Sequence, residues 1–177
     1  MSLVDWPELD VERIVAALNR HAVDYLVVGA MARVLLGSAR LTKDLDICHS
    51  PDRANLKRLA SALGDLDARP RGEDREHPAI LDEVYLDRME IVTLETDAGW
   101  LDVLKWPKGT KGTKSFSDLE ARAQKVAIDG ETVLVASVDD MIAMKLASGR
   151  PQDLADVEEL RALQRLGDEV GENGRDE

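Results

Sequence analysis

The sequence predicts an α/β (α+β) fold, in which a mixed β-sheet is flanked by helices and a small helical portion closes the chain. Three patterns indicate this fold. Segments with apolar residues at helical spacing alternate with short, continuously apolar runs, which are typical of buried strands. Two β-rich runs meet at Asp129-Gly130, a strong hairpin signal. Helical spacing then returns near the C-terminus.

The first half of the chain alternates between helical and strand patterns. Ile14, Val15 and Leu18 recur at helical spacing, so residues 9–22 are expected to form an amphipathic helix. The elements expected after it are a strand over 25–28, a helix over 30–36, a strand over 44–48 and a helix over 52–64.

The second half begins with residues 66–87, which are charged and irregular and give no assignable pattern. After them we expect strands over 88–95 and 100–104, a loop rich in Gly, Thr and Lys over 105–114, a hairpin over 126–135, and helices over 137–147 and 154–163. The predicted organisation is a principal domain over 1–136, closing helices packed on it over 137–166, and a Gly-rich, acidic, disordered tail over 167–177.

Composition excludes several classes of protein. The chain of 177 residues carries 35 acidic and 23 basic side chains, a net charge of −12. Binding along nucleic acid is driven by counterion release from phosphates, which an acidic chain with only three Trp, two Tyr and one Phe does not favour. The single Cys48 excludes a disulfide framework and a cysteine-based zinc site.

The sequence also suggests where the protein works. The N-terminus lacks a basic region followed by an apolar stretch, and no apolar run approaches the roughly 20 residues needed to span a bilayer. We therefore expect no membrane partner and a cytoplasmic location.

Asp44-Leu-Asp46 is the first candidate site. Residues i and i+2 of a strand project from the same face about 7 Å apart, so two carboxylates can converge on divalent ions. Mg²⁺ prefers one or two carboxylates together with substrate phosphates. The other such pair, Asp65-Leu-Asp67, follows a helix in polar surroundings and is typical of a solvated turn. Asp44 and Asp46 instead lie in an apolar strand context, where unpaired carboxylates are unfavourable without a cation.

The segment before these carboxylates offers possible phosphate contacts. Gly29 lies between a predicted strand and a predicted helix, where a phosphate can approach free backbone N–H groups. The alternative is that Gly29 only forms a tight turn. Arg40, Thr42 and Lys43 can counter the charge of a triphosphate, or they form an ordinary surface cluster.

A third carboxylate, Asp102, lies in a predicted strand. If that strand is next to the one bearing Asp44 and Asp46, Asp102 can complete a metal site and deprotonate an acceptor hydroxyl; otherwise a buried hydrogen-bonding role is expected. The following loop, 105–114, carries four lysines and no acid, so it either steers a polyanionic acceptor or is simply solvated.

Charged residues near the C-terminus leave two interpretations open. Lys145, Arg150, Asp153 and Asp156 recur at spacings near one or two helical turns. They either form i, i+3 ion pairs or hold a nucleotide phosphate, with Asp153 orienting Lys145.

Residues 27–47 read Val-Val-Gly-Ala-x-Ala-x-x-x-x-Gly-Ser-x-Arg-x-Thr-Lys-Asp-Leu-Asp-Ile. This pattern resembles the signature of the nucleotidyltransferase superfamily, which has the polymerase-beta-like fold. It is most similar to the AbiEii/MenT-like bacterial nucleotidyltransferases, which are often encoded in toxin–antitoxin or abortive-infection pairs. Residues 137–145 and 149–156 resemble that group's closing helices, so the resemblance covers roughly residues 24–160.

The resemblance implies roles for individual residues. Asp44, Asp46 and Asp102 would be the catalytic carboxylates and would hold two Mg²⁺ ions. The implied nucleotide-binding residues are Gly29, Ala30, Ser38, Arg40, Lys43, Lys145 and Asp153. Ala30 is a departure, because the family usually has Gly or Ser there, and its methyl group narrows the approach to the nucleotide.

The leading hypothesis is a Mg²⁺-dependent nucleotidyltransferase that moves NMP from an NTP to an RNA end, such as that of a tRNA, or to a protein, as one component of a toxin–antitoxin pair. The alternative is a catalytically silent protein of the same fold that binds nucleotide or a partner protein, such as a cognate toxin or antitoxin. A third hypothesis is an unrelated acidic α/β domain, which is favoured if Asp44, Asp46 and Asp102 do not converge.

Overall fold

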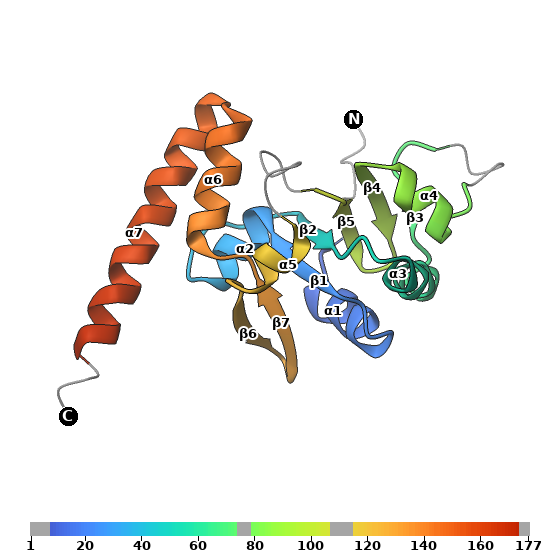
Figure 1. Ribbon diagram of the computed structural model, residues 1–177, viewed down its shortest axis with the longest axis horizontal. Coiled ribbons are helices and arrows are strands. Elements are labelled where there is room, and N and C mark those ends of the chain that lie inside the picture. Colours follow the sequence, from blue (N-terminus) through green and yellow to red (C-terminus); the bar gives the residue numbers. More distant parts are fainter. Residues whose placement is uncertain (1–7, 74–78, 107–114, 174–177) are drawn as a thin grey trace.

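The computed structural model of the chain describes residues 8–73, 79–106 and 115–173, with side chains described as far as residue 167. These residues form a mixed β-sheet flanked by helices, which confirms the predicted fold class (Figure 1). The strands are β1 (Tyr25–Val28), β2 (Asp44–His49), β3 (Arg69–Pro70), β4 (Ile91–Thr96), β5 (Gly99–Leu104), β6 (Gln124–Ile128) and β7 (Glu131–Val135). The helices are α1 (Val11–Arg20), α2 (Gly29–Leu35), α3 (Arg53–Asp65), α4 (Glu83–Arg88), α5 (Phe116–Glu120), α6 (Val138–Ser148) and α7 (Pro151–Asn173).

The strand order in the described sheet is β3-β4-β5-β2-β1-β7-β6. Strand β2 lies between β1, to which it is antiparallel, and β5, to which it is parallel. Strand β1 also pairs in parallel with β7. All four residues of β1 are buried, which explains its continuously apolar sequence, because a central strand is covered on both faces.

Helices α1 and α3 lie side by side against the sheet (Figure 1). Ile14, Val15 and Leu18 of α1 have no exposed side-chain surface, as the helical spacing predicts. The Asp10 side chain accepts a hydrogen bond from the backbone N–H of Arg13 and so caps the start of this helix.

Strands β4 and β5 alternate between a buried and a more exposed face. Val92 and Leu94 of β4, with Leu101 and Val103 of β5, belong to the hydrophobic core. Because side chains alternate along a strand, Asp102 projects from the opposite face to Leu101 and Val103. The alternation therefore fixes which face of the sheet can carry a polar site.

Several elements differ from the sequence-based expectations. Strand β3 and helix α4 occupy the region that gave no assignable pattern, and the strand expected from residue 88 begins at Ile91 because α4 continues to Arg88. Helix α5 was not expected; Ser115 and Asp118 form a reciprocal capping box at its start. Short helices of this kind depend on local caps rather than on long apolar periodicity.

The C-terminal helices α6 and α7 form a hairpin beside the sheet (Figure 1). Gly149 joins them with φ = +66°, a left-handed conformation that glycine adopts without steric penalty. Helix α7 continues to Asn173, so residues 167–173, expected in the disordered tail, are helical. A single Gly167 lowers helix propensity by only about 1 kcal/mol and does not end a helix by itself. The domain boundary at residue 136 stays a prediction.

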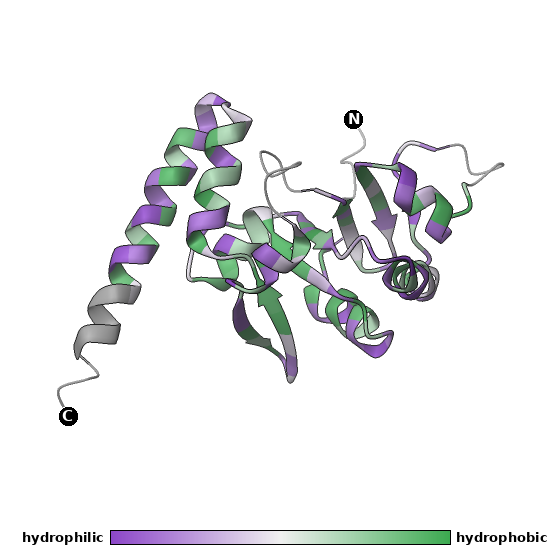
Figure 2. Ribbon diagram, viewed as in Figure 1, coloured by the Kyte–Doolittle hydropathy of each residue, from purple (hydrophilic) through white to green (hydrophobic). Residues whose placement is uncertain are grey.

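The coloured part of helix α7 carries both polar and apolar residues (Figure 2). In the parts of the chain that the structure describes, no helix combines the length and the apolar character that crossing a membrane requires.

A buried ion cluster ties α7 to α2. The Arg33 guanidinium donates to Asp156 Oδ1 at 2.7 Å and to Glu159 Oε2 at 2.9 Å. Only 8% of the side-chain surface of Arg33 and of Asp156 is exposed, so solvent screens this pair weakly. The adjoining loop adds a bond from Ser38 Oγ to Glu159 Oε1 and one from Arg40 Nη1 to Asp156 Oδ1 at 2.9 Å.

We expect Arg33→Ala to lower the free energy of unfolding by about 3 kcal/mol, because it leaves buried carboxylates short of a partner. The matched control is Arg161→Ala, which removes an exposed pair with Glu158 in α7 and is expected to change stability by less than about 0.5 kcal/mol. Urea denaturation measures both. Equal effects of the two substitutions would show that the Arg33 cluster does not secure the hairpin.

Candidate active site

Asp44 and Asp46 share one face of β2. The residues beside them in the strand, Leu45 and Ile47, are fully buried, whereas both aspartates keep partial exposure. The strand places the two carboxylates together, as their spacing predicts.

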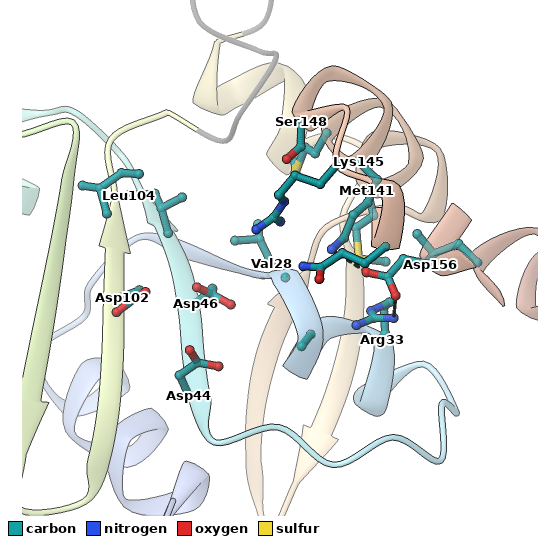
Figure 3. A pocket seen from close by; sticks show the side chains of 17 residues that line it. Val28, Arg33, Asp44, Asp46, Asp102, Leu104, Met141, Lys145, Ser148 and Asp156 are labelled. Carbon is teal, nitrogen blue, oxygen red and sulfur yellow. Dashed lines mark hydrogen bonds and ion pairs between the residues drawn. The ribbon is translucent and has the colours of Figure 1, made fainter. Parts of the chain in front are cut away.

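Strand β5 brings the third carboxylate to the same face. In the parallel pairing of β2 and β5, Asp46 lies opposite Asp102, and Asp44 lies opposite Trp100. The condition on which the sequence-based role of Asp102 depended is therefore met, since the two strands are neighbours. Figure 3 shows the three carboxylates next to one another at one side of a cavity.

Gly29 lies directly against Asp46. Its φ of +69° favours glycine, and a Cβ built there would be 2.2 Å from Asp46 Oδ2. The pairing of β1 with β2 explains why Gly29 contacts Asp46, because Val28 lies opposite Asp46 and Gly29 follows Val28. Glycine is thus required by the approach of a carboxylate, a reason that the sequence alone did not offer.

The cavity has a volume of about 480 Å³. Asp44, Asp46 and Asp102 line one side, and α6 with the start of α7 lines the opposite side (Figure 3). The other lining residues are Val28, Gly29, Ala30, Arg33, Ile91, Leu104, Met141, Met144, Lys145, Ser148, Arg150, Gln152, Asp156 and Leu160. Acidic groups therefore face cationic groups across a space large enough for a small ligand.

The carboxylates perturb one another electrostatically. Burial, together with the nearby charges of Asp44 and Asp102, raises the pKa of Asp46 to about 7, while Lys145 and Arg71 act in the opposite direction. Burial also raises the pKa of Asp102, against the lowering effect of Arg71. The site thus concentrates more negative charge than nearby cations of the described chain offset.

The carboxylate oxygens of Asp44 and Asp46 suit a hard divalent cation. No described residue donates a hydrogen bond to the Asp46 carboxylate, although burial penalises its charge. Asp44 accepts a bond of 2.9 Å from Thr42 Oγ1, which orients its carboxylate. Among the described residues no three acidic, imidazole or thiol groups form a ready-made metal cluster. Two carboxylates nevertheless fit Mg²⁺, which takes its remaining ligands from substrate and water.

The predicted nucleotide-binding residues separate into two groups. Gly29, Ala30 and Lys145 line the cavity. Ser38, Arg40, Lys43 and Asp153 do not belong to its lining. Ser38 and Arg40 bind acidic residues of α7, Asp153 is buried in the helix hairpin, and Lys43 is exposed on the loop before β2.

Lys145 and Asp153 are close together, as their spacing suggests. Lys145 Nζ is 3.2 Å from Asp153 Oδ1 and 2.7 Å from Asp156 Oδ2. Hydrogen bonds from the Arg150 side chain lower the pKa of Asp153, and Lys145 adds to this effect. The acids of α7 thus hold Lys145 at the cavity wall.

Sequence reasoning missed Arg33, Arg71, Ser148 and Gln152. Arg71 donates a hydrogen bond to Asp102 Oδ1, and the other three line the cavity. Ser148 and Gln152 flank Gly149 and Pro151, so the turn signal that ends α6 marks their place on the chain. No local sequence pattern indicates the role of Arg71, because its partner, Asp102, lies on the distant strand β5. Most of the lysine-rich loop, residues 107–114, lies outside the described residues.

Comparisons with solved structures agree with this architecture. A protein of Thermotoga maritima described as a candidate nucleotidyltransferase superposes with a TM-score of 0.52 at 17% identity, over 90% of this chain and 91% of the other. The enzyme ANT(2″)-Ia in complex with adenylyl-2″-tobramycin gives 0.56 at 18% identity, over 92% and 90%. The lincosamide antibiotic adenylyltransferase LnuA, bound to lincomycin, gives 0.57 at 14% identity, over 88% and 99%.

The fold is that of the nucleotidyltransferases. A family model described as "Nucleotidyltransferase of unknown function (DUF6036)" matches residues 111–169, which include α6 and most of α7 but not β2 or β5. No curated protein matches the sequence.

We expect Gly29→Ala to destabilise the protein more than Gly149→Ala. Both positions have nearly the same positive φ, and the left-handed conformation alone disfavours alanine by about 1–2 kcal/mol. A Cβ at Gly149 meets no atom within 4 Å, whereas one at Gly29 clashes with Asp46. Chemical denaturation measures the difference, and adding Asp46→Ala to Gly29→Ala should recover most of it. Equal losses at the two glycines would contradict the steric role of Asp46.

We also expect Asp46 to make stability depend on pH. Its folded-state pKa of about 7 lies above the unfolded value of about 3.9, so the folded protein holds a proton that the unfolded chain releases between these values. Stability is therefore lost as the pH rises from about 4 to the folded-state pKa of about 7, by about 1.4 kcal/mol for each unit of pKa shift. With a metal chelator present, Asp46→Asn should gain stability over wild type as the pH rises. If the difference in free energy of unfolding between Asp46→Asn and wild type stayed constant from about pH 4 to about 7, the raised pKa of Asp46 would be contradicted.

Proposed function

We propose that this protein is a Mg²⁺-dependent nucleotidyltransferase that moves NMP from an NTP to a hydroxyl or phosphate group. The observation that carries the proposal is the register of β2 and β5, which puts Asp46 opposite Asp102, with Asp44 on the same face and Lys145 across the cavity. The nucleotidyltransferase fold supports it.

In the reaction an acceptor oxygen attacks the α-phosphorus, and the bond from that phosphorus to the bridging oxygen breaks, so pyrophosphate leaves with the electron pair. Asp102 takes the proton of an attacking hydroxyl. Lys145 and Arg150 hold phosphate oxygens and reduce charge repulsion as the nucleotide enters. Mg²⁺ ions held by Asp44 and Asp46, with Asp102 as a further ligand, would supply Lewis acidity for the attacking and leaving oxygens. Much of the rate enhancement then comes from positioning.

The remaining nucleotide contacts belong to the same proposal. Gly29 and Ala30 present backbone close to the phosphates, and the methyl group of Ala30 limits how near they come. Ser38, Arg40 and Asp153 act indirectly, because the first two bind acids of α7 and Asp153 binds Lys145, which orients that lysine. Lys43, exposed on the loop before β2, counters the charge of the triphosphate.

For the acceptor we propose an RNA end, such as that of a tRNA, or a protein, within a cytoplasmic toxin–antitoxin pair of the AbiEii/MenT-like kind. The resemblance of residues 27–47 and 137–156 supports this choice. Two of the compared structures concern adenylylation of antibiotics, so hydroxyl-bearing small molecules are the natural comparison in an acceptor screen.

A catalytically silent protein that binds nucleotide or a partner is the second candidate. It is favoured by the bond between Arg71 and Asp102, because a paired carboxylate is a weaker base and ligand. Thermal shift separates the two candidates, since stabilisation by NTP that requires Mg²⁺ indicates a working metal site.

Incubation with α-labelled NTP, Mg²⁺ and total tRNA, cell extract or an antibiotic panel should give a labelled product. Asp44→Ala with Asp46→Ala should reduce its formation by about 10²-fold or more, because both proposed metal ligands are lost.

The matched control is Asp65→Ala with Asp67→Ala, which makes the same change in the other Asp-Leu-Asp sequence. Asp65 pairs with Arg20 and His21 at the surface, away from the cavity lining, so this variant should retain the activity. No labelled product with any acceptor, or equal loss in both double variants, would count against the proposed function.

A further inference from the structure

Arg71 is a cation in direct contact with one of the proposed catalytic carboxylates, Asp102. It follows β3, and its backbone N–H donates to Thr93 O of β4 at 2.9 Å. Thr93 in turn pairs with Asp102 of β5, and Asp102 pairs with Asp46 of β2. Arg71, just after β3, thus continues a row that crosses β4, β5 and β2, so its position beside Asp102 is a consequence of sheet register.

Two contacts and one unpaired atom describe the Arg71 side chain. Its Nη2 donates to Asp102 Oδ1 in an ion pair. The guanidinium carbon lies 4.8 Å from the centre of the Trp100 ring, a cation–π distance that orients the guanidinium plane. The Nε atom is buried and has no hydrogen-bond partner among the residues that the structure describes. Within the described part of the chain, the side chain of Arg71 therefore contacts the Asp102 carboxylate and the face of the Trp100 ring.

The ion pair is shielded from solvent. Only 26% of the Arg71 side chain and 18% of the Asp102 side chain are exposed, so the charge of one strongly affects the other. By contrast, the side chains of the ion pair Arg69–Asp67 are 47% and 66% exposed. Each charge of such an exposed pair is expected to affect the other only weakly.

We propose that Arg71 is an internal counter-cation that competes with divalent metal for Asp102. The inference rests on the proposed function and deepens it. A metal ion approaching Asp46 and Asp102 meets one carboxylate already neutralised and a guanidinium charge close by. Metal alone is therefore bound weakly, whereas the phosphates of an NTP add the negative charge and oxygen ligands that Arg71 offsets. The metal consequently enters together with the nucleotide.

A positioning role for Arg71 and a competing role predict opposite changes in metal binding when Arg71 is removed. If Arg71 only oriented Asp102 for the metal, its removal would weaken metal binding. If it competes, its removal strengthens binding of metal alone and reduces the additional gain that nucleotide brings. The direction of one measured change thus separates the two roles.

The test uses Mn²⁺ as the probe and the electron paramagnetic resonance signal of free Mn²⁺ as the readout, which is independent of activity. Arg71→Gln should tighten binding of Mn²⁺ alone by about fivefold or more, a typical size of coupling between two ligands. The matched control is Arg69→Gln, which removes the same charge two residues away without a bond to Asp102 and should leave binding within about twofold. Asp102→Asn added to Arg71→Gln should abolish the gain.

Unchanged or weaker Mn²⁺ binding in Arg71→Gln overturns the inference. If Asp46→Asn still abolishes binding in that case, the proposed metal site stands and only the role of Arg71 falls. Absence of Mn²⁺ binding in every variant, with and without a non-hydrolysable ATP analogue, overturns the proposed function together with the inference. Circular dichroism checks folding; if Arg71→Gln does not fold, Arg71→Lys, which keeps the charge but not the planar fork, should give a smaller change in the same direction.

Discussion

The pairing of β2 with β5 is the constraint on which the site depends. It sets Asp46 beside Asp102 on one face of the sheet, and the Asp-x-Asp spacing adds Asp44. Burial, which disfavours the charged form, and then the like charges of Asp44 and Asp102 raise the pKa of Asp46. Two neighbouring residues accommodate these carboxylates: Arg71 forms an ion pair with Asp102, and Gly29, which has no side chain, leaves room for Asp46.

The C-terminal hairpin supplies the opposite charge. Lys145 and Arg150 reach the cavity from α6 and the turn after it, and the acids of α7 hold them there. One of these acids, Asp156, also binds Arg33 of α2, so the same carboxylate both attaches the hairpin and orients Lys145. Attachment and charge placement are therefore coupled: a change in α7 that disturbs Asp156 affects the hairpin contact and the cavity wall together.

Local sequence patterns predicted the parts of the fold that local forces determine. Strands β1 and β2 and helix α1 follow from apolar runs and helical spacing, and apolar context distinguished Asp44 and Asp46 from the solvated pair at Asp65 and Asp67. The roles of Arg71 and Glu159 could not be predicted, because each depends on register or packing between segments distant in the chain. Ser38 shows the same limit, since its position in the motif does not reveal that its hydroxyl binds α7.

The row that runs from Val28 through Asp46, Asp102 and Thr93 also has a consequence for how the protein folds. A slip of β5 by one residue against β2 would turn Asp102 into the apolar core, so that register would lose both the core and the site. The two strands are far apart in the chain, and such non-local pairings form slowly during folding. Partly folded chains thus lack the assembled carboxylates, and the capacity to bind a cation there arises only with the completed sheet.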